Sequence, residues 1–342
     1  MKTGDAESVL VTGASGFIGQ HLVRRLIERG DRVSCLVRAT SSIDELRSSG
    51  AHLIVGDVTD RAGMERAMAE SQPGVVFHLA GLVKALRKED FLRVNAGGVE
   101  AVAARCAELA NPPVLVVVSS LAAAGPGTGD QPRTEGDSPA PVSAYGRGKL
   151  AGEQAAARYA ARLPVSVVRP PIVFGPGDLG SLEMFRPIAR SGLHVVPGRE
   201  DRRVSLIHVA DLVALLLLAA EKGERLRADA TPGQGVYFVS AERDPTYVEL
   251  GHAMARALGR RRARVVRMPR PLVRLFGLCG DGVARVRRQP GWVNSDKMAE
   301  ALAGPWACSS EKARRQLGWS PAASLADRLR ETAQWYRQAG WL

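Results

Sequence analysis

The stretch VTGASGFIG at residues 11–19 constrains the fold most, because it places glycines at positions 13, 16 and 19. It follows a short apolar run and opens a segment whose apolar residues recur every three or four positions. In that context Gly13 allows a tight turn, Gly16 lets a pyrophosphate approach the backbone, and Gly19 lets the helix pack closely on the strand. The free N–H groups at such a helix N-terminus attract phosphate. The stretch therefore predicts dinucleotide binding rather than a glycine-rich surface loop.

Short runs rich in Val, Ile and Leu alternate with helix-length segments through the first half of the chain. The expected strands are 8–13, 32–37, 52–57, 74–81, 113–120 and 164–170. Strands that alternate with helices form a parallel sheet with helices on both faces. The sequence thus predicts an α/β fold with a Rossmann-type doubly wound parallel sheet.

The regular alternation of strands and helices ends after about Pro170, where loops lengthen and Pro-rich turns separate the helices. We expect residues 1–170 to form the NADP-binding domain, with 204–221 and 235–240 returning to it. Residues 171–203 and 241–342 would form a smaller, mixed α/β substrate-binding domain. Within it, 271–286 is predicted to be helical. That helix would be either an apolar lid over a greasy substrate or an ordinary amphipathic helix on the core.

The composition, 45% hydrophobic in 342 residues, is that of a soluble globular protein. The opening MKTGDAES lacks the apolar region of a signal peptide, and the longest apolar run, 212–220, is too short to span a bilayer. We therefore expect a cytoplasmic protein with no transmembrane segment. The four cysteines lie far apart, which predicts reduced thiols and no metal site.

A net charge of +12 raises the question of an anionic partner. The basic residues are densest over 255–288, a stretch of low aromatic content with no nucleic-acid-binding motif, so we expect no specific nucleic-acid binding. A solvated basic face, an anionic substrate and a membrane surface all fit this stretch.

A reactive pair lies in SAYGRGKLAGE, where Tyr145 and Lys149 are four residues apart on a predicted helix and share one face. A neighbouring ammonium lowers the pKa of a phenol and so prepares it for proton transfer near neutral pH. Ser119 and Ser120 end a predicted strand, at the edge of the sheet where ligands bind. A hydroxyl there can donate to a substrate carbonyl oxygen.

Together these stretches resemble the extended short-chain dehydrogenases/reductases, which include sugar-nucleotide epimerases, 3β-hydroxysteroid dehydrogenases and dihydroflavonol reductases. The resemblance covers nearly the whole chain, and its motifs keep the family's order: GDVTD at 56–60, HLAG at 78–81, VNAGG at 94–98, SSLAAAG at 119–125, YGRGK at 145–149 and RPPIVFGPGD at 169–178. It implies that Tyr145 is the general acid–base, with Lys149 as its pKa-lowering partner and ribose contact. Ser120 would hold the substrate oxygen, and Ser119 is its rival.

The motif and the resemblance also give a set of contacts. The expected cofactor-binding residues are Gly13, Ser15, Gly16, Phe17, Ile18, Gly19, Arg38, Asp57, Val58, Leu79, Ala80, Gly81, Ser119, Tyr145, Lys149, Pro170, Ile172 and Val173. The expected substrate contacts are Val83, Ser120, Leu121 and Tyr145. Asn95 is expected to be structural rather than catalytic. His208 and Asp211 are expected to cap the helix that follows them or to tie the two parts of the chain together.

The residues after the second strand bear on the choice of cofactor. An acidic residue there binds the ribose 2′-hydroxyl of NAD, whereas arginine accommodates the 2′-phosphate of NADP. The sequence CLVRATSS places Arg38 at this position, followed by Thr40, Ser41 and Ser42. This favours NADP(H) over NAD(H).

Leu121 and Ala122 occupy the positions where the family's 4,6-dehydratases carry an Asp-Glu pair, so elimination chemistry is not expected. The leading hypothesis is an oxidoreductase that interconverts an alcohol and a ketone. The alternatives are a nucleoside-diphosphate-sugar epimerase with tightly bound NAD, where Arg202 or Arg203 would reach a phosphate, and a non-catalytic dinucleotide-sensing protein. The expected partner is a small-molecule substrate. A homodimer would form through helices near 90–110 and 142–161.

Overall fold

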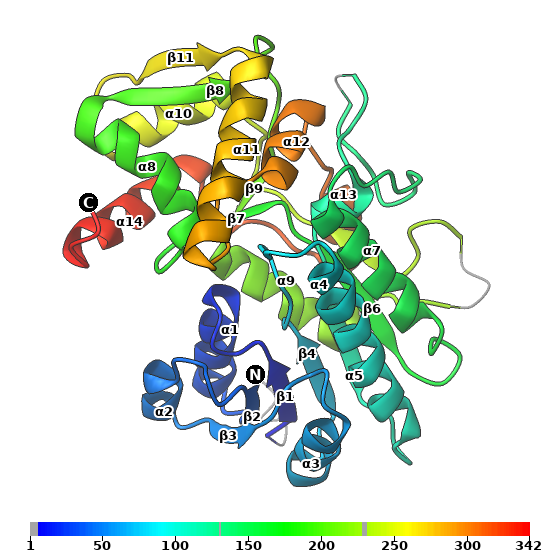
Figure 1. Ribbon diagram of the computed structural model, residues 1–342. Helices are drawn as coiled ribbons and strands as arrows, with labels where there is room; N and C mark the ends of the chain where they lie inside the picture. Colours follow the sequence, from blue (N-terminus) through cyan, green and yellow to red (C-terminus); the bar gives the residue numbers. More distant parts are fainter. Residues whose placement is uncertain (1–5, 130, 228–230) are drawn as a thin grey trace.

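The computed structural model describes residues 6–129, 131–227 and 231–342; residues 1–5 and 130 of the predicted first domain lie outside it. Seven parallel strands form the central sheet in the order β10-β6-β5-β4-β1-β2-β3 (Figure 1). Their bounds are β1 (Ser8–Thr12), β2 (Arg32–Val37), β3 (His52–Val55), β4 (Val75–His78), β5 (Val114–Val118), β6 (Val165–Arg169) and β10 (Val236–Phe238). The order reverses between β1 and β4, so the predicted doubly wound fold is confirmed.

The strands carry apolar residues on both faces because each face packs against helices. Val9 and Val11 enter one core with α1 (Phe17–Glu28) and α9 (Val209–Lys222), whereas Leu10 between them enters the other. The second core contains residues of α3 (Arg61–Ser71), α5 (Gly97–Glu108) and α7 (Ala144–Ala157). This alternation with a period of two is the geometry of a strand buried on both sides.

The connection between β4 and β5 is not the single helix expected near 90–110. It consists of α4 (Glu89–Phe91), a π-helical segment η1 (Leu92–Ala96) and α5. Asn95 lies in η1 with its side chain buried; its Oδ1 accepts from the Leu82 N–H at 2.7 Å and its Nδ2 donates to the Leu82 carbonyl at 3.0 Å. Both polar groups of Asn95 therefore fasten the loop after β4.

A second group of elements covers the carboxyl ends of the strands (Figure 1). It holds two small parallel sheets, β7 (Ile172–Phe174) with β9 (Leu206–His208), and β8 (Leu193–Pro197) with β11 (Arg264–Met268). A third core joins α8 (Leu179–Ser191), α10 (Tyr247–Ala257) and α14 (Leu325–Gln338). The remaining helices are α2 (Asp44–Ser49), α6 (Leu121–Ala124), α11 (Arg270–Arg287), α12 (Ser295–Ala303) and α13 (Glu311–Leu317). In the described ranges no helix has both the length and the apolar character needed to cross a bilayer.

Asp211 links the two parts of the chain. Its carboxylate accepts from the Ala322 N–H at 2.9 Å and from the Arg328 guanidinium on both oxygens, at 2.8 and 3.0 Å. His208 caps α9, because its Nδ1 accepts from the Ala210 N–H at 3.3 Å. The predicted capping and tying roles of this pair are confirmed.

Candidate active site

A pocket of about 600 Å³ opens at the carboxyl ends of β1, β4 and β5. One side is formed by the glycine turn and α1, and another by α7. The far side comes from the C-terminal part of the chain, through α12 and Trp292. The site thus lies at the switch point of the sheet, where doubly wound folds bind their ligands.

The glycine turn needs glycine for two different reasons. Gly13 has a φ of +72°, and a Cβ there would lie 2.6 Å from the Ala80 nitrogen. A Cβ on Gly19 would lie 2.3 Å from the Gly13 carbonyl oxygen. Helix α1 starts directly behind this turn, and no side chain caps its N-terminus. Its first N–H groups are therefore free to bind a pyrophosphate, which fits the predicted cofactor site.

Tyr145 lies in the first turn of α7, buried and edge-on to Phe91 with ring centroids 5.9 Å apart. Burial raises the pKa of its phenol, whereas the positive charge of Lys297 and a hydrogen bond from Ser120 lower it. The protonated phenol is thereby favoured at neutral pH, with two groups in place to stabilise the phenolate.

The cation against the Tyr145 ring is Lys297 of α12, whose Nζ lies 4.3 Å from the ring centroid. Lys149 is half-buried and donates instead to the Val118 carbonyl oxygen at 2.8 Å. Burial lowers the pKa of Lys149 to about 8, against the opposing charge of Glu153. Sequence reasoning did not find Lys297, and no motif around it marks it. It reaches the site only because α12 docks there.

Helix α12 also holds the start of α7. The Asp296 carboxylate accepts from the Ala144 N–H at 2.8 Å and from the Tyr145 N–H at 3.2 Å. Glu300 accepts from the Ser143 hydroxyl at 2.5 Å and pairs with Lys297 at 2.8 Å. The helix that carries Tyr145 is therefore positioned by a segment about 150 residues further along the chain.

The two adjacent serines have different partners. Ser119 donates to the Glu153 carboxylate, which also forms a buried ion pair with Arg169, with Arg169 Nε at 2.9 Å. Ser120 caps α6, accepts from the Ala122 N–H at 3.1 Å and acts to lower the pKa of the Tyr145 phenol. Ser120 is thus the serine that faces the phenol, while Ser119 and Arg169 belong to a buried network below it.

Most of the predicted contacts meet in the pocket. Its lining includes Gly13, Gly16, Phe17, Ile18, Gly19, Leu79, Gly81, Val83, Ser119, Ser120, Leu121, Tyr145, Lys149, Pro170, Ile172 and Val173. Five predicted cofactor residues do not line it: Ser15, Arg38, Asp57, Val58 and Ala80. Arg38 is exposed at the end of β2, and Asp57 follows β3. Burial acts to raise the pKa of Asp57, but hydrogen bonds from Thr59 and the charge of Arg38 lower it overall.

The helix predicted at 271–286 exists as α11, but neither expectation for it holds. No residue of α11 lines the pocket, which is covered instead by Trp292, Lys297, Glu300 and Ala301. Nor is α11 packed on the core along its apolar side, since only Val273, Gly277 and Ala284 are buried.

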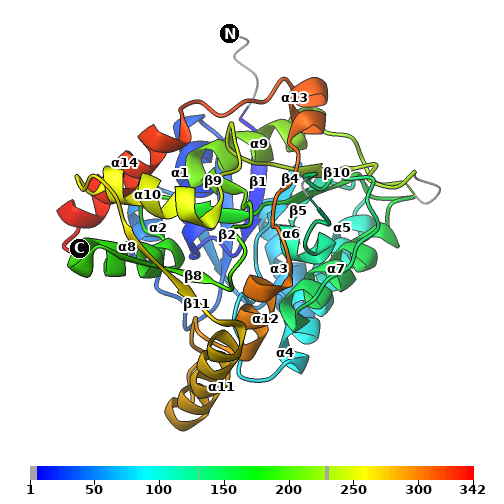
Figure 2. The ribbon, with the colours of Figure 1, turned by 90° about the horizontal axis from the view of Figure 1, so that it is seen from above.

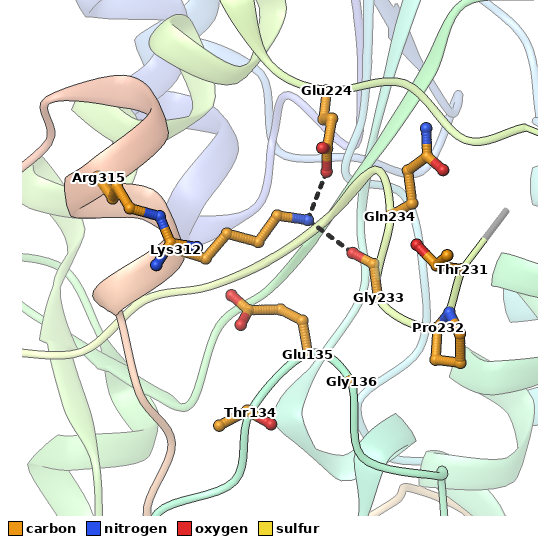
Figure 3. A pocket seen from close by; sticks show the side chains of 10 residues that line it. All are labelled: Thr134, Glu135, Gly136, Glu224, Thr231, Pro232, Gly233, Gln234, Lys312 and Arg315. Atoms are coloured by element: carbon orange, nitrogen blue, oxygen red, sulfur yellow. Dashed lines mark hydrogen bonds and ion pairs between the residues drawn. The ribbon is translucent and has the colours of Figure 1, made fainter.

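A smaller hollow of about 230 Å³ lies beside α13 (Figure 3). Its charged groups face one another: Lys312 Nζ pairs with Glu224 at 2.6 Å and donates to the Gly233 carbonyl at 2.6 Å. Glu135 accepts from the Phe238 N–H at 2.9 Å. These bonds fasten α13 to the loop before β10 and pair the charges of Lys312 and Glu224 with each other.

Comparison with known proteins agrees with this geometry. The model of the NAD dependent epimerase/dehydratase family matches residues 9–231. The ceramide reductase of Caulobacter vibrioides is 33% identical and aligns with 100% of this chain and 98% of its own. The 2-alkyl-3-oxoalkanoate reductase of Stenotrophomonas maltophilia is 28% identical over 94% of this chain and 97% of its own. The solved UDP-glucose 4-epimerase of Thermotoga maritima has a TM-score of 0.75 at 24% identity, covering 97% and 99% of the two chains.

The family binds a nicotinamide dinucleotide, and the relatives named as reductases identify the chain as an enzyme of oxidoreduction. The glycine turn, the doubly wound sheet and the matching relatives lead to one assignment: this chain belongs to the NAD-dependent epimerase/dehydratase family, as an oxidoreductase of the extended short-chain dehydrogenase/reductase type.

Proposed function

We propose that this enzyme reduces the ketone of a hydrophobic, long-chain substrate with NADPH, and that Tyr145 is its general acid. The observation that carries the substrate class is the lining of the pocket beyond the glycine turn. Its side chains are mostly apolar: Leu82, Val83, Leu121, Met184, Tyr247, Trp292 and Trp306. The names of the ceramide and 2-alkyl-3-oxoalkanoate reductases support the same class of substrate.

The pocket lining that the structure describes lacks the arginine side chains that usually bind the diphosphate of a sugar nucleotide. Diphosphates are usually held by the planar fork of arginine, and among the described residues no arginine lines this pocket. Arg202 instead pairs with Glu200 and donates to the Leu302 carbonyl at 2.8 Å, and Arg203 donates to the Asp244 carbonyl at 2.9 Å. The epimerase alternative therefore has less support than the reductase.

In the proposed mechanism Ser120 donates to the substrate carbonyl oxygen and Tyr145 delivers its proton to that oxygen as the alcohol forms. A bound nicotinamide supplies the hydride. Lys149 holds the nicotinamide ribose, and the charge of Lys297 stabilises the phenolate that Tyr145 leaves behind. Helix α12 and Trp292 form the far wall of the pocket that holds these groups.

Replacing Tyr145 by Phe should lower turnover about a thousandfold, because the proton donor is lost. The affinity for NADPH should stay close to the wild-type value, since the ring and its packing remain. Turnover of a long-chain β-keto substrate and NADPH titration would measure the two effects. A variant that retained most of its activity would overturn the assigned mechanism.

The NADP(H) preference rests on Arg38, the exposed cation at the end of β2. Replacing Arg38 by Ala should weaken NADPH binding about tenfold or more, because a charge-assisted bond to the 2′-phosphate is lost. NADH binding should hardly change. Arg47→Ala, at another exposed arginine, is the matched control. Stoichiometric NAD in the purified protein would instead support the epimerase alternative.

The homodimer through the helices near 90–110 and 142–161 remains a prediction. Helices α5 and α7 lie next to each other on one face of the sheet (Figure 1), which is the arrangement that a four-helix interface requires.

A further inference from the structure

Helix α11 exposes an apolar stripe that nothing in the described part of the chain covers. Its members recur every three or four residues, with one adjacent pair, so they share one face of the helix. We call this set the α11 stripe: Leu272, Leu275, Phe276, Cys279, Val283 and Val286. The exposed fractions are 52% for Leu275, 54% for Phe276 and 86% for Val286. A soluble protein rarely exposes a contiguous apolar surface of this kind without a partner for it.

The opposite face of α11 explains why the stripe is held outward. A Cβ on Gly277 would lie 3.0 Å from Met298, and one on Gly280 would lie 2.1 Å from the Val293 carbonyl oxygen. These small residues let α11 pack closely on α12 and on the segment before it. The stripe is therefore fixed away from the body, and the helix projects from the molecule (Figure 2).

The surroundings of the stripe are strongly basic. Between residues 256 and 288 the chain has one acidic residue, Asp281, whose carboxylate accepts from the Ser295 N–H at 3.3 Å. The arginines of the same segment are Arg256, Arg260, Arg261, Arg262, Arg264, Arg267, Arg270, Arg274, Arg285, Arg287 and Arg288. Arg274, Arg285 and Arg287 are exposed on α11 itself. An apolar stripe beside unopposed arginines complements an anionic lipid surface, with side chains among the acyl chains and guanidinium groups at the phosphates.

Just beyond the end of α11 the chain reaches the wall of the catalytic pocket. Trp292, five residues after the end of α11, lines the pocket and is 37% exposed, with the Lys84 ammonium 4.5 Å from its ring centroid. Tryptophan prefers the boundary between headgroups and acyl chains. Trp292 therefore adds an exposed aromatic ring of this kind just after the α11 stripe in the chain.

From these observations we propose that α11 docks the enzyme on anionic phospholipid membranes, lying in the interface without spanning it. A second copy of the chain fits less well, because a two-fold interface would bring the same arginines face to face. Nucleic acid would bind the arginines but leave the stripe in water. The proposal concerns binding alone, so its test is separate from the test of reductase activity.

Cys279 gives a direct probe, since it is the exposed cysteine and the other three are buried. An environment-sensitive maleimide fluorophore on Cys279 should shift to the blue when phosphatidylcholine vesicles with about one third phosphatidylglycerol are added. It should also become protected from an aqueous quencher. About 0.5 M salt should weaken the response. No shift with these vesicles, or a shift produced by duplex DNA or by raising the protein concentration alone, would overturn the proposal.

Vesicle cosedimentation of variants tests which side chains are responsible. Leu275→Gln with Phe276→Gln should lower partitioning onto the anionic vesicles about tenfold, and so should Arg274→Gln with Arg285→Gln. The matched controls are Val55→Gln with Leu92→Gln, exposed apolar residues elsewhere, and Arg24→Gln with Arg47→Gln, which remove the same charge. Controls that lost binding as strongly as the α11 variants would contradict the assignment of the surface.

Discussion

Tyr145 is subject to opposing influences that originate far apart in the sequence. Its own burial favours the phenol, while Lys297 and Ser120 favour the phenolate. Ketone reduction needs the phenol and alcohol oxidation needs the phenolate. The balance between burial and these two groups therefore sets the pH range in which each direction is fast.

Replacing Lys297 by Met should shift that balance. Because the ammonium lowers the pKa of Tyr145, its removal should raise the pKa, and the remaining Glu300 charge acts in the same direction. The pH profile of kcat for alcohol oxidation should move to higher pH. Lys84→Met, at the cation over Trp292, is the matched control. An unchanged profile would contradict the role given to Lys297, and recovery in Lys297→Arg would support it.

At the scale of elements, the site depends on how α12 docks on α7. The N–H groups at the start of α7 are satisfied by the side chain of its N-cap residue, Ser143, and by Asp296 from a distant segment. The outside acceptor links the orientation of the catalytic helix to the C-terminal part of the chain. Small displacements of a reacting group have large effects on rate.

Replacing Asp296 by Ala should therefore lower kcat about tenfold while reducing the free energy of unfolding by only about 1 kcal/mol. Asp60→Ala is a matched control, because Asp60 caps α3 away from the pocket, accepting from Gly63 N–H at 3.0 Å. It should show the same loss of stability with an unchanged kcat. If the two variants lost activity equally, α12 would not be positioning α7. Asp296→Asn, which keeps an acceptor, should recover part of the rate.

At the scale of the whole molecule, the two parts of the chain are joined through buried polar groups near His208. Burial and the charge of Arg328 lower the pKa of His208 to about 4. The folded protein therefore keeps this imidazole neutral, whereas the unfolded chain binds a proton as the pH falls through about 6.5. Stability is lost as the pH falls from about 6.5 toward 4.

His208→Asn, which keeps the cap on α9, should reduce this acid sensitivity. Between pH 7 and pH 5 the free energy of unfolding of the wild-type protein should fall by on the order of 2 kcal/mol because of His208. In the variant this contribution should be absent. Urea unfolding at the two pH values would measure the difference. His52→Asn, at an exposed histidine, is the control. Equal losses in His208→Asn and wild type would contradict the assignment.

The sequence by itself determined the sheet, the glycine turn and the Tyr145 helix, because each rests on local signals: alternating apolar runs, a turn that only glycine permits, and a four-residue spacing on one helix. The sequence also favoured Ser120 over Ser119 as the serine that holds the substrate oxygen. Lys297, Asp296 and the bond between Ser119 and Glu153 came only from the tertiary structure, since each depends on contacts between segments far apart in the chain. The same holds for α11. Its apolar periodicity predicts a helix, but periodicity is identical for a stripe that is buried and one that faces outward. Only the packing of Gly277 and Gly280 on the neighbouring segment decided which face was covered.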